Sequence, residues 1–94
     1  MHVVPPTAGG IDAAVEALRR GVLIAYPTET VYGLGVNPFN ACALERLFQA
    51  KGREQGKAVL LIIGDTAQLD RLTGPLTERA RLFAEHFWPG PLSL

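Results

Sequence analysis

The chain has 94 residues, which is enough for one domain at most. Hydrophobic residues make up 48% and charged residues 19%, a composition typical of a soluble globular protein and not of a disordered chain. The formal net charge is zero, which excludes a general electrostatic attraction to nucleic acid, so an RNA or DNA partner would need a local basic patch.

The spacing of apolar residues predicts four elements in the first half of the chain. They are a helix over 11–20, a strand over 22–26, a strand over 32–36 and a helix that runs through residue 51. Gly21 is a natural stop for the first helix, and Asn40 is a natural cap for the second. The first strand is apolar throughout, which predicts burial on both faces, and Gly33 and Gly35 in the second would let a backbone or a ligand come close. The apolar face of the second helix would consist of Ala43, Leu44, Leu47 and Phe48.

The second half continues the alternation of strands and helices. It contains an apolar strand over 57–63, a short helix capped by Asp65 or Thr66, a helix from Pro75 to about Phe87 and a rigid turn over 88–91. Residues 92–94 look like the start of a strand, so we expect the rest of the sheet to be missing from this chain; a short edge strand is the alternative. The alternation favours an α/β (α+β) fold in which helices flank a twisted mixed sheet.

A polar bend lies between the first two strands, at the kind of strand end where small-molecule sites are often built. Thr28, Glu29 and Thr30 follow a proline there. The hydroxyls could satisfy local backbone groups in an ST-turn, or one could bind a polar substrate while the other holds the loop. Glu29 could be a solvated loop acid, a partner for Lys51 or Arg53, or an indirect metal contact. The residues alone do not choose among these roles.

Three cations lie near the end of the second helix. Lys51 and Arg53 flank a glycine, and Lys57 enters the strand that follows. Cations commonly complement the helix dipole at this position. The alternative is a phosphate site, because arginine offers a planar fork of donors and lysine a flexible point charge. The segment is not a Walker A loop, since the required Gly-Lys-Ser/Thr order is absent.

The remaining candidate residues favour structural roles. His2 and His86 are far apart and have no Cys/His cluster around them, so no zinc site is predicted. The single cysteine, Cys42, cannot form an intrachain disulfide and is expected to pack among apolar helix residues. The sequence has no signal-peptide pattern and no apolar run of roughly 18 residues, which predicts a cytoplasmic protein without a membrane partner.

Three motifs stand out together: residues 27–35 (PTETVYGLG), residues 50–53 (AKGR) and residues 88–92 (WPGPL). In order and spacing they resemble the YrdC/Sua5 family, the L-threonylcarbamoyladenylate synthases that act in making the N6-threonylcarbamoyladenosine of tRNA. The resemblance implies a YrdC/RibB-like fold around a concave, positively charged cavity, with residues 1–94 as the N-terminal portion of a single domain. The family's catalytic domain is longer, and its second half would be absent here.

The resemblance also implies roles for individual residues. Thr30, with Thr28 beside it, would bind the substrate L-threonine, and Lys51 and Arg53 would hold the phosphates of ATP. Lys57 falls where the family has a nucleotide-contacting asparagine or a lysine. No catalytic nucleophile and no protein metal site are implied.

The implied reaction works by positioning and charge neutralisation. The amine of L-threonine combines with bicarbonate or CO2 to give a carbamate, whose oxygen attacks the α-phosphate of ATP and expels pyrophosphate. The cations and a Mg2+ ion would neutralise the charge that grows on the phosphates. The product would pass to proteins that act downstream in tRNA modification.

Two other functions compete with the enzyme. One is a double-stranded RNA-binding or regulatory module that retains the fold without catalysis, although zero net charge argues against strong RNA binding. The other is a structural half-domain that is inert without its partner segment. Because the second half of the family's domain would be absent, we expect the 94-residue chain alone to be inactive or nearly so.

Overall fold

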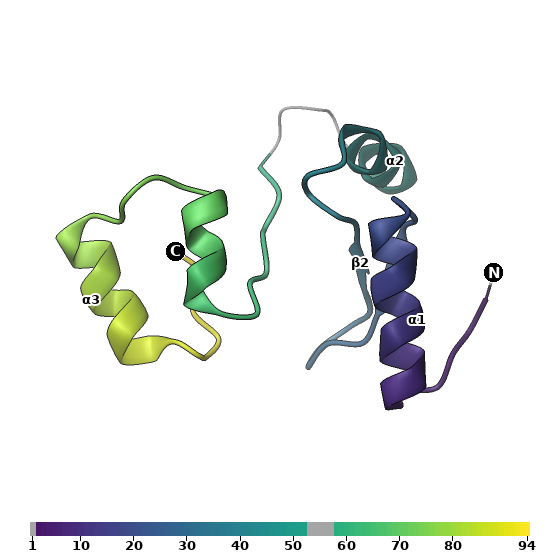
Figure 1. The fold of residues 1–94 in the computed structure, drawn as a ribbon, viewed down its shortest axis with the longest axis horizontal. Coiled ribbons are helices and arrows are strands. Elements are labelled where there is room, and N and C mark those ends of the chain that lie inside the picture. Colours follow the sequence, from purple (N-terminus) through teal and green to yellow (C-terminus); the bar gives the residue numbers. More distant parts are fainter. Residues whose placement is uncertain (1, 53–57) are drawn as a thin grey trace. The chain divides into compact units, whose positions relative to one another are not determined.

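The computed structural model describes residues 2–52 and 58–94. The chain divides into two compact units, Met1–Val59 and Leu60–Leu94. The first contains α1 (Ala8–Arg19), β1 (Ile24–Tyr26), β2 (Gly33–Gly35) and α2 (Ala41–Lys51), and the second contains the 3-10 helix η1 (Thr66–Arg71) and α3 (Glu78–Phe87) (Figure 1). This mixture of helices and strands confirms the predicted α/β class.

Helix α1 begins earlier than its apolar spacing predicts. Its cap is Thr7, whose hydroxyl oxygen accepts a hydrogen bond from the Gly10 amide at 3.3 Å. The helix stops where predicted, at Gly21, which has a φ of +77°. The amides of Gly21 and Val22 donate to two carbonyl oxygens of the last turn at 3.0 and 2.9 Å, the pair of bonds that defines a Schellman motif. Glycine adopts this left-handed conformation at little cost, so Gly21 determines where α1 ends.

The two strands form an antiparallel hairpin beside α1 (Figure 1). Ile24 and Tyr26 are half-buried, but Ala25 and Leu34 are exposed. The prediction that the first strand is buried on both faces is therefore wrong, because no described element covers the face that carries Ala25. The register places Ile24 opposite Gly35, Ala25 opposite Leu34 and Tyr26 opposite Gly33.

The close approach predicted at the glycines of β2 is made by a side chain of β1. A Cβ atom on Gly33 would lie 3.2 Å from Cζ of Tyr26, and one on Gly35 would lie 2.9 Å from Cε1 of the same ring. The two glycines lie on one face of β2, so the Tyr26 ring lies against both. This packing favours the observed register, because a slip by one residue would turn the ring to the other face.

Helix α2 has the predicted cap and the predicted stop. The side-chain oxygen of Asn40 accepts a hydrogen bond from the amide three residues along the chain at 3.0 Å, and Gly52 follows the helix with a φ of +61°. Of the four residues on the predicted apolar face, only Ala43 and Leu47 are buried. The other two, Leu44 and Phe48, are half-buried and border a surface hollow.

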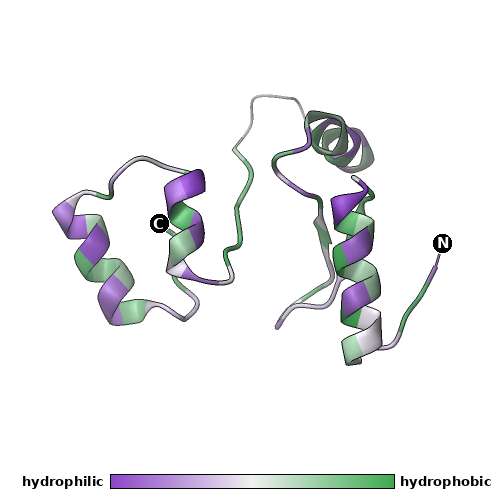
Figure 2. Cartoon of the chain, in the orientation of Figure 1, coloured by the Kyte–Doolittle hydropathy of each residue, from purple (hydrophilic) through white to green (hydrophobic). Residues whose placement is uncertain are grey.

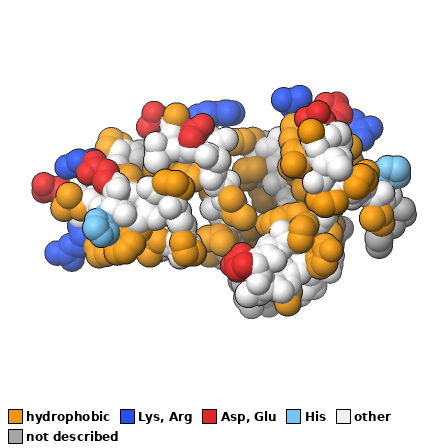
Figure 3. All heavy atoms as spheres, turned by 90° about the horizontal axis from the view of Figure 1, so that it is seen from below, with side chains coloured by type: hydrophobic (Ala, Val, Ile, Leu, Met, Phe, Trp, Pro, Cys, Tyr) orange, Lys and Arg blue, Asp and Glu red, His pale blue; other side chains and the backbone are white. Residues whose placement is uncertain are grey.

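The predicted strand over 57–63 is not formed by its described residues, 58–63. Every residue of this segment is hydrophobic (Figure 2), yet Leu60 and Ile62 are 68% and 72% exposed. A strand needs a neighbour to satisfy its backbone hydrogen bonds, and no described segment pairs with this one. Residues 92–94 form no strand for the same reason. Figure 3 shows many other hydrophobic side chains at the surface.

Two side chains accept hydrogen bonds from backbone amides at the start of the short helix η1. Asp65 is the cap, as one of the two predicted alternatives, and it accepts a hydrogen bond from the Gln68 amide at 3.2 Å. The Gln68 side chain in turn accepts a hydrogen bond from the Gly64 amide at 2.6 Å. This reciprocal arrangement resembles a capping box and satisfies two backbone donors at the start of the helix.

Helix α3 begins later than predicted. Thr77, not Pro75, sets its start, because the Thr77 hydroxyl accepts a hydrogen bond from an amide of the first turn at 3.2 Å. The helix ends at Phe87, and Trp88 is extended. The Trp88 indole nitrogen donates to the Leu92 carbonyl oxygen at 2.8 Å, which closes the predicted turn.

Candidate functional site

The polar loop between β1 and β2 is organised around the hydroxyl of Thr28. This hydroxyl donates a hydrogen bond to the Val31 carbonyl oxygen and accepts one from the Thr30 amide at 3.3 Å. The hydroxyl oxygen of Thr30 lies 3.4 Å from the same Thr28 oxygen. These are the local hydrogen bonds of an ST-turn, which is one of the two roles that the sequence leaves open for this pair.

The loop presents its polar groups to solvent. Thr28, Glu29 and Thr30 are all exposed, and the two residues that follow, Val31 and Tyr32, are 74% and 75% exposed. Within residues 2–52 and 58–94, Glu29 forms no ion pair. Of the alternatives left open for Glu29, pairing with Lys51 is therefore not formed, and pairing with Arg53 lies outside the described residues.

Lys51 occupies the end of α2. It is exposed, and it lies in the last turn, where the helix dipole favours a cation. The other two predicted phosphate ligands, Arg53 and Lys57, lie outside the described residues. The threonine loop is at the turn end of the hairpin, whereas α2 follows its open end (Figure 1), and no hydrogen bond or ion pair joins the loop to Lys51 in the part of the chain that the structure describes.

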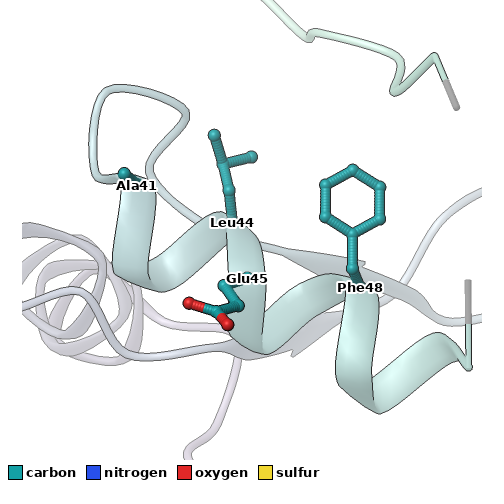
Figure 4. Close-up of a pocket in the computed structure, with 4 residues that line it drawn as sticks. All are labelled: Ala41, Leu44, Glu45 and Phe48. Carbon is teal, nitrogen blue, oxygen red and sulfur yellow. The ribbon is translucent and has the colours of Figure 1, made fainter. Parts of the chain in front are cut away.

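A surface hollow lies on one side of α2 (Figure 4). It is lined by Ala41, Leu44, Glu45 and Phe48, all from a single helix, and the side chains of Leu44 and Phe48 point to the same side. This helical spacing makes the hollow an apolar face of α2 with one carboxylate at its edge. None of these four residues is a cation, so they do not form a phosphate site, and Thr28, Thr30 and Lys51 are not among them.

The minor candidates contribute little to a site. Cys42 is exposed, contrary to the prediction that it packs, because α2 buries the neighbouring Ala43 and Leu47 positions instead. The described residues bring together no group of three or more histidine, cysteine, aspartate or glutamate side chains that could hold a metal. His86 lies edge-on to Phe87, with ring centroids 4.7 Å apart.

None of the helices in the described ranges has the length and apolarity to cross a bilayer.

Two structural features in and beside the loop were not predicted from the sequence. One is the Val31 carbonyl, which accepts the only hydrogen of the Thr28 hydroxyl. The other is the Tyr26 ring, which lies on Gly33 and Gly35 next to the loop in the hairpin register. A tyrosine in one strand opposite two glycines in the next is a recognisable sequence signal, but only once the register is known.

Most of this chain aligns with the sequences of known proteins. The family model described as "Telomere recombination", which covers the Sua5, YciO and YrdC proteins, matches residues 16–94. The chain is 44% identical over 84 residues to the threonylcarbamoyl-AMP synthase of Bacillus subtilis and 47% identical over 85 residues to that of Chromohalobacter salexigens. These alignments cover 89% and 90% of this chain, but 24% and 46% of the relatives. The chain thus spans between a quarter and a half of the length of these relatives.

A solved structure shares the fold. The crystal structure of Pyrococcus abyssi Sua5 complexed with L-threonine aligns with a TM-score of 0.83 and 40% sequence identity, over 94% of this chain and 26% of that protein. The sequence match extends over far more than half of the chain, and the structural match agrees with it. The chain belongs to the YrdC/Sua5 family.

Proposed function

We propose that this chain carries the threonine-binding loop and the first phosphate-binding cations of an L-threonylcarbamoyladenylate synthase. The supporting observation is an identity of 44% to 49%, over 81% to 90% of the chain, to proteins named threonylcarbamoyl-AMP synthase. The reaction would convert L-threonine, bicarbonate and ATP to threonylcarbamoyl-AMP and pyrophosphate, for modification of tRNA to N6-threonylcarbamoyladenosine. Residues 1–94 would form one portion of a single catalytic domain.

The loop at Thr28–Thr30 is proposed to bind L-threonine. Its exposed hydroxyls, held by local hydrogen bonds, support this role because a small polar amino acid is recognised by a few well-placed polar groups. The Pyrococcus abyssi Sua5 protein, a relative at 40% identity, was crystallised in complex with L-threonine. In this chain, the β1–β2 hairpin would provide the rigid support for the loop.

The cations that follow α2 are proposed to bind the phosphates of ATP. Lys51 is exposed and forms no ion pair with any other described residue, so its ammonium group is available to a phosphate. Gly52, which directly follows Lys51, adopts the left-handed conformation that commonly ends a helix. Arg53 and Lys57 would supply the remaining positive charge.

The proposed reaction requires no covalent bond to the protein. The threonine amine forms a C–N bond with bicarbonate and releases water; a carbamate oxygen then attacks the α-phosphorus of ATP, and the bond to the β-phosphate breaks as pyrophosphate leaves. Lys51, Arg53 and Lys57 would offset the charge on the phosphates, and Thr30 would orient the amino acid. A Mg2+ ion would neutralise further phosphate charge. Glu29 is the one carboxylate of the described loop, so the loop would supply few ligands, and ATP oxygens and water would hold most of the ion.

A graft into a relative tests this proposal. The 84 residues of this chain that align with the Bacillus subtilis threonylcarbamoyl-AMP synthase would replace the matching segment of that protein, and pyrophosphate release from ATP would be measured. We expect release that requires both L-threonine and bicarbonate. Grafted protein that folds, as judged by circular dichroism, but releases no threonine-dependent pyrophosphate would refute the proposal. Arg53→Ala should greatly weaken the activity if Arg53 binds phosphate, and unchanged activity would remove that assignment.

The RNA-binding alternative has less support. Nine basic and nine acidic side chains give zero net charge, and two of the arginines pair with glutamates of their own helices, at 3.8 Å for Arg19 with Glu16 and 2.8 Å for Arg81 with Glu85. Such pairing reduces the positive potential that a phosphate backbone would meet. Double-stranded RNA binding by the chain that persists above about 200 mM salt would favour this alternative instead.

A further inference from the structure

The structure indicates that the two threonines of the loop have different roles in binding L-threonine, an inference that rests on the proposed function. We infer that Thr28 is a positioning residue, and that it makes the Thr30 hydroxyl an acceptor of a hydrogen bond from the substrate. Thr30 would therefore recognise the amine or the side-chain hydroxyl of L-threonine, and the substrate carboxylate would be held by other groups. Only Thr30 would then contact the substrate, whereas the family resemblance implies contacts from both threonines.

The hydrogen-bonding capacity of Thr28 is used within the loop. A threonine hydroxyl has one hydrogen to donate and two lone pairs that accept. The hydrogen of Thr28 goes to the Val31 carbonyl oxygen, which can only accept. One lone pair accepts the Thr30 amide at 3.3 Å, and the Thr30 hydroxyl oxygen lies 3.4 Å away, in reach of the other. A direct substrate contact by Thr28 would have to replace one of these three interactions.

The direction of the Thr28 hydrogen bond sets the direction of its neighbour. Because Thr28 has no second hydrogen, the interaction between the two hydroxyls requires Thr30 to be the donor. The Thr30 hydroxyl then keeps two lone pairs and no free hydrogen. Since Thr30 is exposed, these lone pairs are accessible to a ligand that approaches the loop.

The chemistry of the amino acid then selects which end meets Thr30. L-threonine has donors at its amine and its side-chain hydroxyl, whereas its carboxylate can only accept. The Thr30 amide is also occupied, by Thr28, so it offers no donor to a carboxylate either. A carboxylate placed at the Thr30 hydroxyl would meet oxygen lone pairs, which repel it.

The loop geometry can be tested in the 94-residue chain itself. Thr28→Val keeps the shape of the side chain but removes the hydroxyl, so we expect the Thr30 amide proton signal to shift and its exchange with solvent to become several-fold faster in NMR spectra. Thr28→Ser should restore both properties. Thr73→Val is the matched control, because Thr73 is an exposed threonine whose hydroxyl donates to the neighbouring Gly74 carbonyl oxygen at 2.6 Å. An unchanged Thr30 amide in Thr28→Val would overturn the inference.

Substrate binding is tested with the grafted synthase and calorimetry. Thr30→Val and Thr28→Val should each raise the dissociation constant for L-threonine by about fivefold to tenfold, the effect of one hydrogen bond. The double variant should be no worse than Thr30→Val alone, and Thr28→Ser should bind like the parent. Additive losses would mean that Thr28 makes its own substrate contact and would contradict its positioning role.

Two analogues identify the donor that meets Thr30. With (R)-1-amino-2-propanol, which lacks the carboxylate, the penalty of Thr30→Val should persist; its disappearance would place the carboxylate at Thr30 and overturn the inference. With L-2-aminobutyrate, which lacks the hydroxyl, a lost penalty assigns the contact to the substrate hydroxyl and a retained one to the amine, and both results support an acceptor at Thr30. These readouts are binding constants, so absent pyrophosphate release in the unsubstituted graft would count against the proposed function and not against this inference.

Discussion

Replacing Gly35 by alanine should weaken the hairpin that supports the threonine loop. The new Cβ atom would lie 2.9 Å from Cε1 and 3.6 Å from Cδ1 of Tyr26. Non-bonded carbon atoms prefer separations of about 3.5–4.0 Å, so the ring would have to move by roughly 0.5 Å or more. The φ of Gly35 is not positive, so alanine is not strained by the backbone there. The penalty therefore comes from the Tyr26 contact.

The size of the effect follows from two opposing contributions. Overpacking of this kind costs about 1–3 kcal/mol, while alanine in a strand is favoured over glycine by roughly 0.5–1 kcal/mol because the unfolded chain loses less freedom. We expect a net loss of about 0–2.5 kcal/mol in the free energy of unfolding. In a Tyr26→Ala background the ring is gone, and the same substitution should stabilise by about 0.5–1 kcal/mol.

The assay is a urea titration in which NMR signals of hairpin residues report the first unit alone. The four proteins of the cycle are the parent, Gly35→Ala, Tyr26→Ala and the double variant, and the coupling free energy is the quantity to compare. Gly9→Ala is the control, since its Cβ would meet nothing within 4 Å in α1, and it should be neutral or stabilising by up to about 1 kcal/mol. A coupling near zero, or a stabilising Gly35→Ala in the parent, would show that the Tyr26 ring does not determine the need for glycine.

Three further outcomes are expected. Gly21→Ala should lower the free energy of unfolding in urea by about 1–2 kcal/mol, because the φ of Gly21 is +77° and the new Cβ atom would lie 2.6 Å from Nδ2 of Asn40. Equal stability of the variant and the parent would refute the close contact between Gly21 and Asn40. Lys51→Ala in the grafted synthase should raise the KM for ATP by about tenfold, whereas Arg19→Ala, another exposed cation, should not, and equal effects would indicate a general charge effect. The 94-residue chain alone should show no threonine-dependent pyrophosphate release, since Thr28, Thr30 and Lys51 are all solvent-exposed in its structure, and measurable turnover would contradict this.

Some helix ends could be predicted from the sequence because each depends on a few neighbouring residues, but the starts of α1 at Thr7 and of α3 at Thr77 were not predicted. Asn40 caps α2 and Gly21 stops α1, both as expected. Strand formation was harder to predict, since a strand exists only if another segment pairs with it. The hydrophobic run over 58–63 has the composition of a buried strand, but nothing in the described ranges pairs with it.

The polar loop could be singled out from the sequence as a candidate site, but its internal hydrogen bonds could not be predicted. A threonine pair beside a proline predicts an ST-turn and a binding loop equally well. Only the folded loop shows that the Thr28 hydroxyl is satisfied by Val31 and Thr30, which is the observation behind the different roles proposed for the two threonines. The contact of Tyr26 with Gly33 and Gly35 was also hidden, because it depends on the strand register.

Both proposed binding segments depend on how α1 ends. The chain passes from Gly21 directly into β1 and so to the threonine loop. The same glycine holds α2, since its carbonyl oxygen accepts a hydrogen bond from Nη1 of Arg46 at 3.2 Å and the Asn40 amide packs where a Cβ atom would lie. Gly21→Ala should therefore weaken the binding of both L-threonine and ATP in the grafted synthase. Gly35→Ala changes only the hairpin, so it should weaken the binding of L-threonine more than that of ATP. A shared anchor for the two segments would keep the amino acid and the phosphates in fixed relative positions, as a reaction that depends on positioning requires.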